Sequence, residues 1–168
     1  MTSVRATHLE FQDENRKGVR LQAFLHKNIA VAGEYFSLQL DLYNPNRITI
    51  HRISAALVQE RILGPTEEKN VILLTKNLLD VYDSQDEHLY GNFQLLLPKK
   101  LVASFSWKPT EWPFRSPLIV RYKLHLEANM HSSFNNIRLQ VPLIIINATP
   151  TNEDEIMPPP SYETLFPV

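Results

Sequence analysis

Apolar and polar residues alternate along much of this 168-residue chain with a period of two. Between Tyr35 and Tyr43, one phenylalanine and three leucines occupy every second position, and serine, glutamine and aspartate stand between them. Successive side chains of a β-strand point to opposite faces of its sheet, so this period predicts a strand with one buried face. The same alternation predicts further strands at 19–25, 89–97, 118–128 and 137–145. Another predicted strand starts at Ile48, alternates as far as Leu57 and ends at Gly64-Pro65-Thr66.

Several positions interrupt the alternation. The step from Ile50 to Ile53 shifts it by one residue, which predicts a β-bulge near His51 and Arg52. Gly91 stands in the middle of a predicted strand and indicates a bulge or a close backbone approach.

The first and last strands carry their own exceptions. Phe24 is the one apolar residue on the polar face of the first strand. Residues 143–146 are apolar at every position, as expected where both faces of a strand are covered. Pro142 lacks an N–H donor and therefore predicts an edge or a bulge.

The segment 70–82 fits two interpretations. Val71, Leu74, Leu78 and Val81 would lie on one face of a helix, whereas the apolar run 71–74 fits a buried strand. We favour extended structure because the neighbouring segments are predicted strands. The chain is then an all-β protein, an antiparallel immunoglobulin-like β-sandwich of seven or eight strands. We expect residues 19–147 to form this domain, 1–18 to be a flexible N-terminal segment, and 148–168 to be a disordered, proline-rich tail.

The loop 99–117 contains Trp107, Trp112 and Phe114 among three prolines. We expect these aromatic residues to cap one end of the sandwich, and a binding patch is the less favoured alternative.

Composition excludes several classes of protein. The formal net charge is -1 and the basic residues are scattered, so we expect no nucleic-acid binding and no direct membrane insertion. Cysteine is absent, and the four glycines are too far apart for a phosphate-binding loop. No signal peptide or long apolar run is present, so we expect a cytoplasmic protein.

Ser104, His88, His125 and His131 are the candidates that a hydrolase would use. No motif places the serine beside a base, and His125 falls on the polar face of a predicted strand. We therefore expect no enzyme, no catalytic residue, no cofactor and no metal site.

The tail contains Pro158-Pro159-Pro160-Ser161-Tyr162-Glu163. Successive prolines fix φ and remove donors, which favours an extended polyproline II conformation. Pro159, Pro160, Ser161 and Tyr162 form a Pro-Pro-x-Tyr segment, which resembles the peptides that bind the aromatic grooves of WW domains. The prolines would form the stacked ridge, and Tyr162 would be the anchor. The alternatives are a chance arrangement in a proline-rich terminus, a tyrosine-based sorting motif at 162–165, and a weak PDZ-type terminus.

Short motifs along the predicted domain resemble the C-terminal domain of the arrestin family. In the first half they are the Ala32-Gly33-Glu34 turn, the Asn44 turn and Ala55-Ala56-Leu57-Val58-Gln59. In the second half they are Leu97-Pro98, Ser104-Phe105, Ile119-Val120-Arg121-Tyr122-Lys123-Leu124 and Val141-Pro142-Leu143-Ile144-Ile145.

An arrestin C-terminal domain followed by Pro-Pro-x-Tyr resembles the α-arrestins, or arrestin-domain-containing proteins. That resemblance implies a non-catalytic adaptor that recruits HECT-type ubiquitin ligases, through their WW domains, to membrane-protein cargo for ubiquitylation, endocytosis and sorting. It also implies a place at the plasma membrane or endosomes through partners. These proteins have two arrestin lobes, so we expect either a fragment or a one-lobed relative, and cargo binding between lobes does not carry over. The alternative is a β-sandwich scaffold or trafficking subunit that binds through its own faces, with an incidental tail.

Overall fold

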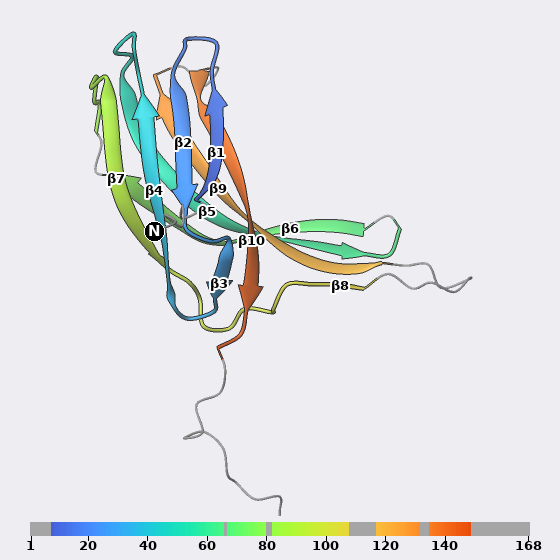
Figure 1. The fold of residues 1–168 in the computed structure, drawn as a ribbon. Helices are drawn as coiled ribbons and strands as arrows, with labels where there is room; N and C mark the ends of the chain where they lie inside the picture. Colours follow the sequence, from blue (N-terminus) through green and yellow to red (C-terminus); the bar gives the residue numbers. More distant parts are fainter. Residues whose placement is uncertain (1–7, 66, 80–81, 108–116, 132–134, 149–168) are drawn as a thin grey trace, which may run out of the picture.

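The computed structural model describes residues 8–65, 67–79, 82–107, 117–131 and 135–148 (Figure 1). In these residues, β-strands form two sheets that pack face to face. All strand neighbours are antiparallel except β3 and β10, which run parallel. The predicted all-β sandwich is confirmed.

Sheet I has the strand order β1-β2-β4-β7. Its strands are β1 (Leu9–Glu14), β2 (Arg20–Leu25), β4 (Tyr35–Tyr43) and β7 (His88–Leu96). Sheet II has the order β3-β10-β9-β5-β6, and β8 pairs with the first residues of β9. Its strands are β3 (Ile29–Val31), β5 (Ile50–Leu63), β6 (Glu67–Leu79), β8 (Phe105–Trp107), β9 (Leu118–Met130) and β10 (Ile137–Ile146).

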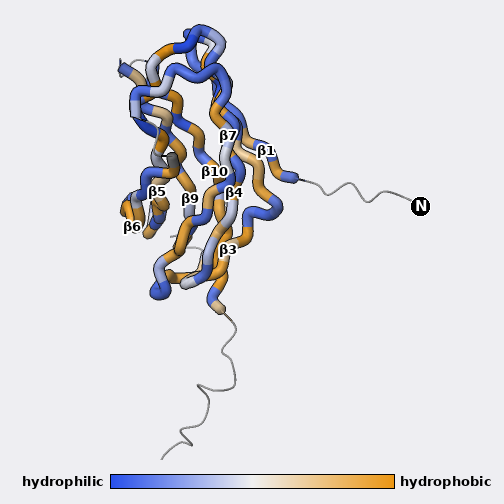
Figure 2. Tube along the Cα trace, turned by 90° about the vertical axis from the view of Figure 1, so that its left-hand side faces the viewer, coloured by the Kyte–Doolittle hydropathy of each residue, from blue (hydrophilic) through white to orange (hydrophobic). Residues whose placement is uncertain are grey.

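The hydrophobic core lies between the two sheets, because one face of most strands is apolar. In β4 the alternation predicted from sequence buries Phe36, Leu38, Leu40 and Leu42 and leaves the intervening residues at least partly exposed. Figure 2 shows the two layers from the side, with β5 and β6 in one and β4 and β7 in the other. Burying a leucine side chain contributes about 1.5–3 kcal/mol, so this alternation is the main determinant of the fold.

Three predictions about individual positions are confirmed. Of the segment 70–82, residues 70–79 lie in the extended strand β6 (Glu67–Leu79). The register of β5 against β9 shifts between Ile50 and Arg52, where the bulge was expected. Pro142 lies at a sheet edge. In the described residues, β10 pairs at this position only with β9, because its pairing with β3 begins at Ile144.

The prediction of a flexible segment over residues 1–18 is wrong for residues 9–14, which form the edge strand β1. Each residue from Leu9 to Glu14 pairs with a residue of β2. Phe11 packs against the core, and Glu14 forms an ion pair with Arg20 at 3.3 Å. An edge strand with one core contact and several charges is hard to tell from a linker by its sequence.

Two expectations about strand surfaces are also wrong. The end of β10 is not covered on both faces, since Ile144 and Ile146 are 45% and 43% exposed. Gly91 shows neither a bulge nor a close backbone approach, because it pairs regularly with Leu40. A Cβ atom at Gly91 would instead lie 2.6 Å from Cζ of Phe93, so glycine leaves room for that ring.

Parts of β5, β6, β8 and β9 extend sideways beyond sheet I (Figure 1). We call this region the sheet II extension; it comprises residues 59–63, 67–71, 105–107 and 118–122. Trp107 lies there and is 56% exposed, so the expectation that it caps the sandwich is wrong. Trp112 and Phe114 lie outside the described residues. The outer part of the extension, which carries Leu63, Phe105 and Trp107, is exposed because the strands of sheet I do not reach it.

Candidate interaction site

The predicted binding residues Pro159, Pro160, Ser161 and Tyr162 lie outside the described residues. The structure does locate the point from which the tail begins. Ile146, the last residue of β10, pairs with Val31 of β3, and the Ala32 N–H donates to the Ile146 carbonyl at 3.0 Å. Asn147 and Ala148 follow and are exposed. The tail therefore starts beside β3, at one end of the sandwich (Figure 1).

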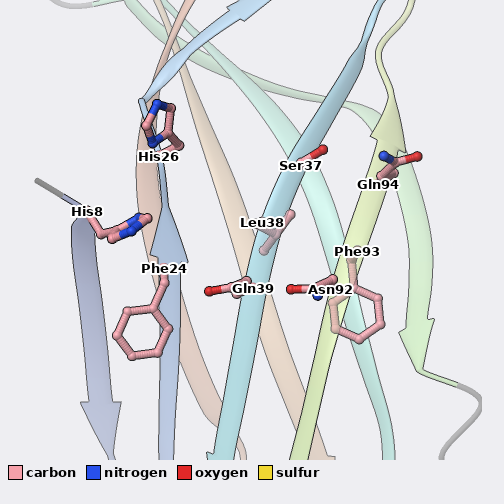
Figure 3. Close-up of a pocket in the computed structure, with 9 residues that line it drawn as sticks. All are labelled: His8, Phe24, His26, Ser37, Leu38, Gln39, Asn92, Phe93 and Gln94. Carbon is pink, nitrogen blue, oxygen red and sulfur yellow. The ribbon is translucent and has the colours of Figure 1, made fainter. Parts of the chain in front are cut away.

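A hollow of about 270 Å³ lies on the outer face of sheet I (Figure 3). Phe24 of β2, Gln39 of β4 and Asn92 of β7 are direct cross-strand neighbours and line it. His26 and Ser37 line its other end. The hollow thus combines the phenyl rings of Phe24 and Phe93 with a row of polar side chains.

A second hollow of about 200 Å³ continues from the first, because His26 and Ser37 line both. Tyr35 and Ile29 contribute apolar surface to it. Val31 also lines it and pairs with Ile146, so one end of this hollow lies beside the start of the tail. We call the two hollows together the His26 groove. Its position links the outer face of sheet I to β3.

The polar residues of the His26 groove offer hydrogen-bond donors. Ser37 pairs across the strands with Gln94, as Gln39 does with Asn92. Within the part of the chain that the structure describes, none of these four side chains makes a hydrogen bond to another protein group. Amide and hydroxyl groups can each donate, so the groove suits a ligand rich in acceptors. The strand order that joins these residues is not visible in the sequence; Phe24, apolar on a polar face, was the only signal.

The start of the sheet II extension is marked by buried polar contacts. The Tyr122 hydroxyl donates to the Val102 carbonyl at 2.5 Å and accepts from Nε2 of Gln59 at 2.7 Å. Burial raises the pKa of Tyr122, which keeps the hydroxyl protonated as a donor. Beyond this point the apolar residues Leu63, Phe105 and Trp107 are exposed.

On the opposite face of the same strands, Glu60 is a buried carboxylate whose side chain is only 8% exposed. It binds Arg121 Nε at 2.7 Å and Lys123 Nζ at 2.5 Å. Burial acts to raise the pKa of Glu60, but the ion pairs with Lys123 and Arg121 outweigh it, so the pKa is lowered. His125 lies nearby on β9, and its pKa is lowered by burial first and then by the Lys123 charge.

We predict that Glu60 makes the stability of the domain depend on pH under acidic conditions. A carboxyl group with a lowered pKa in the folded state stabilises the fold above its unfolded pKa, and this contribution is lost as pH falls through the folded pKa. Glu60→Gln should therefore lower the free energy of unfolding at pH 7, and the difference from wild type should shrink between about pH 5 and pH 3. Urea unfolding of wild type and Glu60→Gln at pH 7, pH 5 and pH 3 measures this difference in stability.

Glu14→Gln is the matched control, because the Glu14–Arg20 pair is about half exposed and such pairs contribute little. A difference between wild type and Glu60→Gln that stays constant as pH falls would contradict the role given to Glu60.

The structure does not assemble a catalytic site from the hydrolase candidates. The Ser104 hydroxyl accepts a hydrogen bond from the Ile145 N–H at 2.9 Å, whereas His88 stacks on Tyr43 with ring centroids 4.9 Å apart. His131 lies beside His51. In the described part of the chain, no group of three or more histidine, aspartate or glutamate side chains is placed to hold a metal. The same residues include no helix with the length and hydropathy that crossing a membrane requires.

Comparisons with known proteins agree with this architecture. Residues 15–150 match the family model of the arrestin (or S-antigen) C-terminal domain. Among solved structures, the sporulation control protein Spo0M from Bacillus subtilis is similar, with a TM-score of 0.59 and 10% sequence identity. The similarity covers 78% of this chain and 50% of the Spo0M chain, so this chain spans half of that protein. A search of curated proteins gave no match. At such low identity the structural likeness shows the fold alone.

Proposed function

Because this chain belongs to the family of arrestin C-terminal domains, we propose that it is a non-catalytic adaptor between a WW-domain protein and a membrane-protein cargo. In this proposal Pro159, Pro160 and Tyr162 bind the WW domain, and Ser161 is the spacer between them. The WW protein is a HECT-type ubiquitin ligase, which ubiquitylates the cargo for endocytosis and sorting. The chain acts in the cytoplasm and reaches the plasma membrane or endosomes through its partners.

The observation that carries the proposal is the order of two features in one chain. An arrestin C-terminal domain is followed by Pro-Pro-x-Tyr, and the ten residues 149–158 separate the last described residue from Pro159. Ten extended residues reach at most about 35 Å, which is enough for a WW domain to bind without contacting the sandwich.

The strength of such a contact is limited by its size. A four-residue segment covers much less than the roughly 800 Å² per partner of a standard interface. We expect a dissociation constant on the order of 10 μM, equivalent to about -7 kcal/mol. Recruitment at this affinity gains from a second contact or from several WW domains in one partner.

The sheet II extension favours a second candidate function, that of a scaffold that binds partners through its own surface. Leu63, Phe105 and Trp107 are exposed apolar residues on strands that sheet I does not cover. Grouped apolar surface of this kind marks interaction sites in soluble proteins. In this alternative the tail is incidental.

One experiment separates the two functions. The intact chain and a chain ending at Met157 are each immobilised, and binding of a tandem WW domain from a HECT-type ligase is measured. The adaptor predicts binding to the intact chain and none to the shortened chain, because only the former contains the motif. Equal binding to both chains would rule out the tail as the binding site and would favour the scaffold function.

A further inference from the structure

We propose that the His26 groove is a second binding site for a proline-rich segment, and that its occupant is this chain's own tail at residues 156–162. The proposal rests on the proposed function only for its consequence, which is that docking in the groove competes with binding to a WW domain.

The chemistry of the groove matches that of the segment. A polyproline II segment has no internal hydrogen bonds, and its prolines have no N–H, so it presents carbonyl acceptors and pyrrolidine rings. The groove offers donors from Ser37, Gln39 and Asn92, and aromatic rings from Phe24 and Tyr35. Aromatic-lined grooves with such donors are how proteins bind proline-rich peptides.

The position of the groove matches the origin of the tail. Val31 lines the groove and pairs with Ile146, two residues before the last described residue. From Ala148 the tail can enter the groove directly. The residues between Ala148 and Pro159 span at most about 35 Å when extended, which is the reach available along the groove. The tail therefore begins where its proposed site ends.

Charge favours the same path. The tail carries Glu153, Asp154 and Glu155 just before its prolines. Lys27 lines the groove, and Lys99 packs against Gly33, next to Ala32, which bonds to the end of β10. Only Glu34 opposes this attraction among the residues that line the second hollow. Lys27 and Glu34 balance within the second hollow, and Lys99 adds a positive charge beside the turn next to it.

The expected effect on WW binding follows from mass action. For a shallow groove we take a dissociation constant on the order of 0.1 mM, and a short tether gives an effective concentration on the order of 1 mM. The docked fraction is then about nine-tenths, which weakens WW binding to the intact chain about tenfold relative to a free peptide of residues 151–168.

Nuclear magnetic resonance tests the docking directly. Side-chain amide signals of Gln39, Asn92 and Gln94 are compared in the intact chain and in a chain ending at Ala148. We expect these signals to differ, independently of protein concentration, and the 151–168 peptide added to the shortened chain should restore them. Identical signals in both chains would overturn the proposal. Signals that depend on concentration would also overturn it, and would make a second copy of the chain the occupant.

WW titrations supply the second measurement. Tyr35→Ala should strengthen WW binding to the intact chain severalfold by releasing the tail. Tyr90→Ala is the matched control: it removes a tyrosine of similar exposure, 62% against 66%, from sheet I outside the groove. Equal effects of the two substitutions would contradict the proposal. If no variant and no free peptide binds a WW domain, the proposed function fails, and the amide signals still decide the docking.

Discussion

Tyr162→Ala is expected to weaken binding of a single WW domain to the free tail peptide of residues 151–168 about thirtyfold. The tyrosine ring is the largest apolar group of the Pro-Pro-x-Tyr segment, and truncation of an aromatic anchor commonly costs 2 kcal/mol or more. A loss of about 2 kcal/mol weakens a 10 μM contact roughly thirtyfold, to about 300 μM. Isothermal titration at fixed salt and temperature measures the change.

Ser161→Ala is the control for this substitution, because it alters the same segment at the position between the prolines and the anchor. Its dissociation constant should stay within about twofold of wild type. Wild-type affinity in Tyr162→Ala would rule out this tyrosine as the anchor, whatever else the tail does.

The strands that the sequence predicted well are those with one face in the core. β4 and β9 sit between neighbours and bury every second residue, so their hydropathy repeats the geometry of the sheet. β1 escaped prediction because only Phe11 ties it to the core, and its pairing with β2 rests on the backbone and on polar side chains such as Glu14 and Arg20. Backbone pairing leaves no mark on the choice of side chains.

The sheet II extension could not be predicted for a related reason. Past Leu57, the strand β5 continues as Val58, Gln59, Glu60 and Arg61, which do not alternate between apolar and polar. Gln59 is nevertheless buried, because its partner is the Tyr122 hydroxyl, 63 residues away in the chain. The sequence places the end of this strand at Gly64-Pro65-Thr66, but it does not show that the part after Leu57 extends beyond sheet I.

The His26 groove shows the same limit at the level of a site. The strand residues of its first hollow come from three strands that are adjacent only because sheet I has the order β2-β4-β7, and its second hollow adds residues of β3. A sequence shows which face of a strand is polar, but it does not show which strands are neighbours. Phe24 is the apolar residue on a polar strand face, and only the structure shows that it lines a hollow.

Asn44 illustrates how a turn signal can conceal a structural role. The sequence indicates a turn at Asn44-Pro45-Asn46, and a turn is present, but Asn44 is completely buried. Its side-chain amide donates to the Ile48 carbonyl at 2.8 Å and to the Asp86 carbonyl at 3.2 Å. Its side-chain oxygen accepts from the Ile48 N–H at 2.9 Å. One side chain therefore joins the β4–β5 turn to the segment that leads into β7.

We accordingly predict that Asn44→Ala lowers the free energy of unfolding by about 2–4 kcal/mol, because it removes three hydrogen bonds and leaves partly buried backbone groups without partners. Urea unfolding followed by circular dichroism measures the loss. Asn46→Ala is the control: Asn46 is exposed and donates one bond, to the Lys17 carbonyl at 2.8 Å, so we expect less than about 1 kcal/mol. If the two substitutions cost the same, the turn would depend on its backbone alone, and the Asn44 side chain would not join the two segments.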